Sequence, residues 1–105
     1  MATADEARVE LGRVVDRLRS MPLTRLAAPW GGYPSRAAGA RALAQRLADT
    51  AADLAGLPHR LVPDVGDAAV GDQVAVTGRD LLSLELSEDD LAAVVADLRE
   101  VRLTL

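Results

Sequence analysis

The chain of 105 residues contains no cysteine, which excludes disulfide bonds, thiol nucleophiles and thiolate metal ligands. It contains a single histidine, His59, and the nearest downstream carboxylates are Asp64 and Asp67. A histidine followed by acids five and eight residues later matches no recognised ligand spacing. We therefore predict that the protein holds no metal ion and needs no cofactor.

Aromatic residues are almost absent, because the chain has no phenylalanine, one tryptophan and one tyrosine. The core must be built from leucine, valine and alanine, which suits helices that pack at short distances. Lysine, isoleucine and asparagine are also missing, and all 12 basic residues are arginine. The codons of these missing residues and of phenylalanine are rich in A and T, so the composition indicates a GC-rich bacterial genome.

The charge and the length limit the classes of partner. A formal net charge of −4 argues against nucleic acid as a partner, since nucleic-acid-binding proteins usually carry a concentrated basic patch. The N-terminus is acidic and has no apolar run of the kind found in signal peptides, and no segment approaches the ~18 apolar residues of a membrane span. We expect one cytoplasmic domain, residues 1–105, that binds neither nucleic acid nor membrane.

Four stretches carry apolar residues at helical spacing between capping signals. Thr3 to Ser20 begins with the capping box Thr-Ala-Asp-Glu, and pairs such as Glu10 with Arg13 are expected on its outer surface. The second stretch is 36–55, with a stripe that runs to Leu54, the third is 64–85, and the fourth begins after Ser87. The sequence predicts an all-α fold, a small four-helix bundle in which successive helices are antiparallel neighbours. The alternating tail 101–105 is compatible with fraying or with a short strand.

The third stretch, 64–85, has a competing interpretation. Residues 73–77 and 82–86 could instead form a β-hairpin around Gly78-Arg79-Asp80, which would make the fold α+β with a hairpin at about 73–86. Apolar and polar residues alternate well in 82–86 but poorly in 73–77, so we favour the helix. Asp64 and Asp67 are both plausible N-terminal caps of that helix.

Small residues recur on one side of this expected central helix. Gly71, Ala75, Gly78 and Leu82 follow one another at spacings of four, three and four. An interior glycine destabilises a helix by ~1 kcal/mol relative to alanine, so two on one side indicate the close approach of another backbone or a ligand. We interpret these four residues as a helix-crossing surface or a ligand groove.

The segment Trp30-Gly31-Gly32-Tyr33 lies between two prolines and contains both aromatic residues. Tryptophan and tyrosine are enriched at interaction hot spots, which makes this loop a candidate partner-binding site. The alternative is that Trp30 folds back and closes one end of the bundle.

No catalytic set can be identified, because the lone histidine cannot be placed beside any serine, threonine or acid. We therefore favour a non-catalytic protein–protein interaction module, either a homodimer or a small accessory subunit that docks on a larger protein. The alternative is a small-molecule-binding protein or enzyme with a pocket over the Gly71/Gly78 groove and with Arg79, Asp80 and His59 as polar groups. A third option is an acidic regulator of a basic protein.

Overall fold

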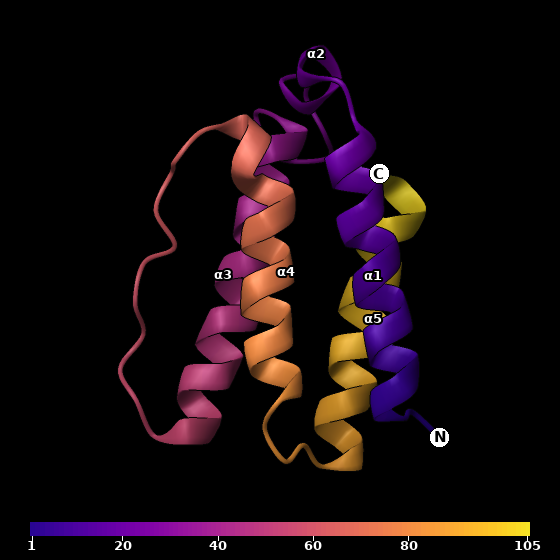
Figure 1. The fold of residues 1–105 in the computed structure, drawn as a ribbon, viewed down its shortest axis with the longest axis vertical. Coiled ribbons are helices and arrows are strands. Elements are labelled where there is room, and N and C mark those ends of the chain that lie inside the picture. Colours follow the sequence, from indigo (N-terminus) through magenta and orange to yellow (C-terminus); the bar gives the residue numbers. More distant parts are fainter.

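Four long helices and one short helix form the structure, a computed structural model that describes residues 1–105 (Figure 1). They are α1 (Ala4–Ser20), α2 (Leu23–Leu26), α3 (Arg36–Ala55), α4 (Val70–Leu82) and α5 (Glu88–Thr104), with a 3₁₀ turn at Asp67–Ala69. The prediction of an all-α helical bundle is confirmed. The hairpin alternative is wrong, since the turn it requires lies inside α4. None of the helices is both long enough and apolar enough to cross a lipid bilayer.

Side-chain caps fix the start of three long helices. The hydroxyl of Thr3 accepts a hydrogen bond from the amide of Glu6 at 3.1 Å, and Ser35 and Ser87 make the same bond to Ala38 and Asp90 at 3.0 Å. Each such bond satisfies an amide that has no partner within the helix, and its loss typically destabilises by ~1 kcal/mol. Gly56, with φ of 69°, ends α3 in the left-handed conformation that glycine adopts without strain.

α4 is shorter than the predicted helix over 64–85, and neither predicted aspartate caps it. The Asp64 carboxylate instead accepts a hydrogen bond from the Gly66 amide at 3.0 Å. Gly66 has φ of 104°, which no helix accommodates, so the chain enters the 3₁₀ turn only after it. α4 ends at Leu82, so Glu85, the last residue of the predicted helix, lies outside it.

The helices run up, down, down and up in Figure 1. α1 and α3 are antiparallel, but the extended segment 57–66 returns along the side of the bundle, so α4 runs parallel to α3 (Figure 1). The prediction that successive helices are antiparallel neighbours is therefore wrong. α3 and α4 are neighbours but parallel, α4 packs between α1 and α3, and α5 packs on α1 and not on α4 (Figure 1). We call residues 57–66 the crossover loop.

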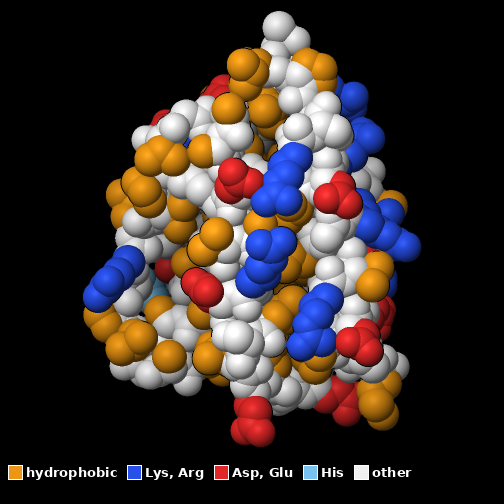
Figure 2. Space-filling view, in the orientation of Figure 1, with side chains coloured by type: hydrophobic (Ala, Val, Ile, Leu, Met, Phe, Trp, Pro, Cys, Tyr) orange, Lys and Arg blue, Asp and Glu red, His pale blue; other side chains and the backbone are white.

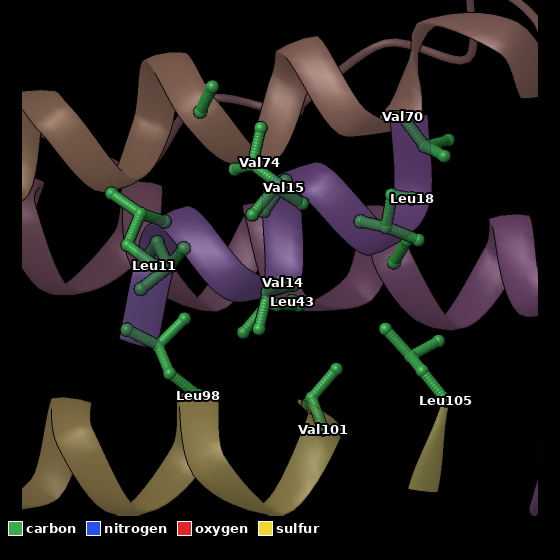
Figure 3. Packing of buried hydrophobic residues seen from close by; sticks show 14 of the residues in the cluster. Leu11, Val14, Val15, Leu18, Leu43, Val70, Val74, Leu98, Val101 and Leu105 are labelled. Carbon is green, nitrogen blue, oxygen red and sulfur yellow. The ribbon is translucent and has the colours of Figure 1, made fainter. Parts of the chain in front are cut away.

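The core lies among all four long helices and consists only of aliphatic side chains and one methionine. Figure 3 shows Leu11, Val14 and Val15 of α1 facing Val74 of α4 on one side and Leu98 of α5 on the other. The C-terminus belongs to this core, because α5 continues to Thr104 and Leu105 is buried. The tail over 101–105 is therefore helical as far as Thr104 and is not a strand.

The last turns of α3 leave the core. Leu54 was expected in the buried stripe, but 43% of it is exposed. α3 has 20 residues and α4 has 13, which correspond to about 30 and about 20 Å of helix. The two helices begin at the same end of the bundle, so the end of α3 extends past the end of α4, and residues 53–55 are exposed (Figure 1).

Candidate functional site

The Gly71/Gly78 side of α4 is buried, and α1 of the same chain lies over it. A Cβ atom on Gly78 would lie 2.5 Å from Leu11 Cδ1, and a Cβ atom on Gly71 would lie 3.0 Å from Arg19 Cγ. Ala75 and Leu82 are buried in the same contact. α1 therefore lies close to α4 at both glycines.

A shallow groove of about 400 Å³ remains beside this contact, between α1 and the exposed edge of α4. Ala75 and Leu82 contribute to its lining and Arg79 lies on its rim, but Asp80 and His59 do not line it. The three polar groups proposed for a pocket over the glycines therefore do not come together.

Trp30 in the aromatic loop folds back onto the bundle. Its ring lies against Gly39 of α3 so closely that a Cβ atom there would overlap it. The ring stacks on Tyr33 with centroids 5.7 Å apart, and the indole Nε1–H donates to the carbonyl of Thr104 at 2.9 Å. This places Trp30 between the start of α3 and the end of α5, whereas Gly31 and Gly32 lie exposed at the tip of the turn.

Glu10 is the one buried charged residue, with 3% of its surface exposed. Its carboxylate accepts a hydrogen bond from Arg102 Nε at 2.7 Å and weaker ones from Arg99 and Arg13, each at 3.4 Å. Sequence spacing predicted the Glu10–Arg13 pair but placed it on the outer surface. The bond from Arg102 lowers the pKa of Glu10 below its ordinary value of 4.5, even though burial acts in the opposite direction.

We expect Glu10→Gln to destabilise the protein by about 1–2 kcal/mol at neutral pH, because Arg102 loses a charged partner but keeps access to water. A lowered pKa in the folded state stabilises the protein above the unfolded pKa, and this contribution is lost as the pH falls through the lower, folded value. In urea titrations the difference between parent and variant should shrink below pH 4.5. An equal difference at every pH would contradict this account, and the exposed Asp5→Asn serves as the control.

His59 pairs with two aspartates of α3, Asp53 and Asp49, and not with Asp64 or Asp67, the acids that follow it in the sequence. Its Nε2 lies 2.6 Å from Asp53 Oδ1, and its Nδ1 lies 3.5 Å from Asp49 Oδ1. The hydrogen bond to Asp53 raises the pKa of His59 above 6.5. All three residues are on or near the surface, and no group of three or more histidine, cysteine or acidic residues is arranged to hold a metal ion.

Two glutamines attach the crossover loop to the helices. Gln45 of α3 donates to the Arg60 carbonyl at 2.9 Å and accepts from the Val62 amide at 2.7 Å. Gln73 of α4 donates to the Pro63 carbonyl at 2.7 Å. These bonds satisfy three backbone groups of a segment that has no secondary structure of its own, and they hold its backbone against α3 and α4.

Apolar side chains of the crossover loop point into solvent. Leu61 is 86% exposed, and Leu57 and Val65 of the loop and Val76 of α4 are each more than half exposed. In Figure 2 apolar atoms gather along the left edge of the molecule, where Figure 1 places the loop. We call the surface formed by Leu57, Leu61, Val65 and Val76 the crossover face.

Two adjoining hollows interrupt the crossover face. One, of about 530 Å³, lies between the last turns of α3 and the end of α4 and is floored by Ala48, Ala51, Ala52 and Ala55. The other, of about 480 Å³, lies between the loop and α4 and is mainly apolar. Ala48 and Arg60 line both hollows, which therefore lie next to each other.

The sequence reasoning missed this face, although two signals were present. Leu57, Leu61 and Val65 recur every four residues in a segment without helix caps, and the alanines of 36–55 exceed what one buried stripe can hold. Comparison with protein-family models, with curated protein sequences and with solved structures finds no match to this chain.

Proposed function

We propose that the chain is a non-catalytic protein–protein interaction module and that the crossover face is its binding surface. The observation that supports this is the large exposure of four aliphatic side chains on one side of a small chain. Apolar surface of this kind, rimmed by polar residues, is typical of sites that another protein covers.

The rigidity of the face also supports the proposal. The hydrogen bonds from Gln45 and Gln73 hold the backbone of the loop, so little backbone conformational entropy is lost when a partner binds. The alternative of a ligand pocket over Gly71 and Gly78 has less support, because Leu11 and Arg19 occupy that side of α4.

Site-specific photocrosslinking in the cells that produce the protein tests the proposal. A photoreactive amino acid at position 61 should give an adduct of one discrete mass, and Val76→Glu should abolish it. The matched control is the same amino acid at Leu103, an exposed leucine of α5 that lies outside the crossover face. Absence of a discrete adduct at position 61, or equal labelling at both positions, would refute the proposal.

A further inference from the structure

We infer that the protein covering the crossover face is a second copy of this chain, related to the first by a two-fold axis. This inference rests on the proposed function and names its partner. In such a dimer the same surface serves both subunits, so the surface must be complementary to itself. The crossover face and the alanine-lined hollow beside it have this property in shape, and Arg60 and Asp80 of that hollow have it in charge.

The shape contains a ridge and a hollow side by side. Leu57 and Leu61 protrude from the loop, and the alanine-floored hollow of about 530 Å³ lies next to them between α3 and α4. A two-fold axis between ridge and hollow places the leucines of each subunit in the hollow of the other. The methyl side chains of Ala48, Ala51, Ala52 and Ala55 leave room for that insertion.

Two charged residues of the hollow are also complementary to each other across such an axis. Arg60 and Asp80 both line the same hollow, and neither makes an ion pair within the chain, although most other arginines do. The same axis brings Arg60 toward the partner subunit's Asp80 and Asp80 toward the partner subunit's Arg60. Two equivalent ion pairs at the rim fix the orientation of the dimer and disfavour other arrangements.

Sedimentation equilibrium over a wide concentration range tests this inference with the purified full chain. The parent should form a dimer, and Leu61→Glu should remain a monomer at the same concentrations. Arg60→Glu and Asp80→Arg should each weaken dimerisation by roughly tenfold or more, because each places like charges opposite one another twice. The double variant Arg60→Glu/Asp80→Arg should regain an affinity close to that of the parent.

Recovery of the affinity in the double variant is expected only if Arg60 of each subunit faces Asp80 of the other. Circular dichroism confirms that each variant is folded, and Leu103→Glu controls for adding a charge at an exposed leucine elsewhere. A parent that stays monomeric, a dimer indifferent to Leu61→Glu, or a double variant no better than the single ones would overturn the inference. In the first case a crosslink from position 61 to a protein of another mass would leave the proposed function standing, whereas no crosslink would remove both.

Discussion

Gly78→Leu is expected to destabilise the protein by about 3 kcal/mol, and Gly78→Ala by about 1 kcal/mol. Any side chain at this position enters the space of Leu11, both of whose methyl groups lie within 2.7 Å of the new Cβ atom. Overpacking of this kind typically destabilises by ~1–3 kcal/mol. The gain in helix propensity, up to ~1 kcal/mol for alanine, offsets only part of it. Chemical denaturation measures both values.

The control is a second helical glycine with open space around it. A Cβ atom on Gly12 of α1 would have no neighbour within 4 Å, so Gly12→Ala should stabilise the protein by up to ~1 kcal/mol. The change in stability for Gly71→Ala should lie between those for Gly78→Ala and Gly12→Ala, because the atom nearest to the new Cβ belongs to the flexible side chain of Arg19. If Gly78→Ala melts higher than the parent, α1 does not press on α4 as described.

Trp30→Ala is expected to destabilise the protein by about 3 kcal/mol, the low end of the range for buried aromatic residues, because Trp30 is only partly buried. The substitution removes the ring that covers Gly39 and the hydrogen bond to the Thr104 carbonyl. Association should be unchanged once the variant is folded, because Trp30 lies outside the crossover face. Denaturation curves and sedimentation of the same variant measure both quantities.

Two further substitutions make the test of Trp30 more specific. Gly39→Ala keeps the tryptophan in the sequence but pushes its ring away from α3. The fluorescence of Trp30 should therefore shift to the red, and the stability of the protein should fall. Leu23→Ala removes an exposed leucine side chain near the same end of the bundle and should change stability by less than ~0.5 kcal/mol. A Trp30→Ala variant of normal stability with weakened association would instead make the aromatic loop the interface.

The features that could be predicted from the sequence are local ones. The caps at Thr3, Ser35 and Ser87 and the left-handed Gly56 depend on residues within one turn, and the structure places them where the spacing indicates. The periodicity of the central segment likewise separates the buried Val74 from the exposed Val76. Local signals of this kind do not depend on how the helices are arranged.

What could not be predicted depends on contacts between distant segments. Nothing near Glu10 in the sequence indicates that Arg99 and Arg102 of α5 will cover it, so it resembles any surface glutamate. The parallel pairing of α3 and α4 follows from the length of the crossover loop, whose bonds to Gln45 and Gln73 join residues 10 to 17 positions apart. The overhang of α3, and with it the crossover face, follows from that pairing.

Amide hydrogen exchange across a dilution series is the most direct test of the claim that a second copy covers the crossover face. At concentrations where the protein associates, exchange should slow in residues 57–66 and in the last turns of α3, and dilution should remove that protection. α1 and the aromatic loop should exchange equally at both concentrations. Concentration-dependent protection confined to α1 or to Trp30–Tyr33, or protection nowhere, would contradict the account.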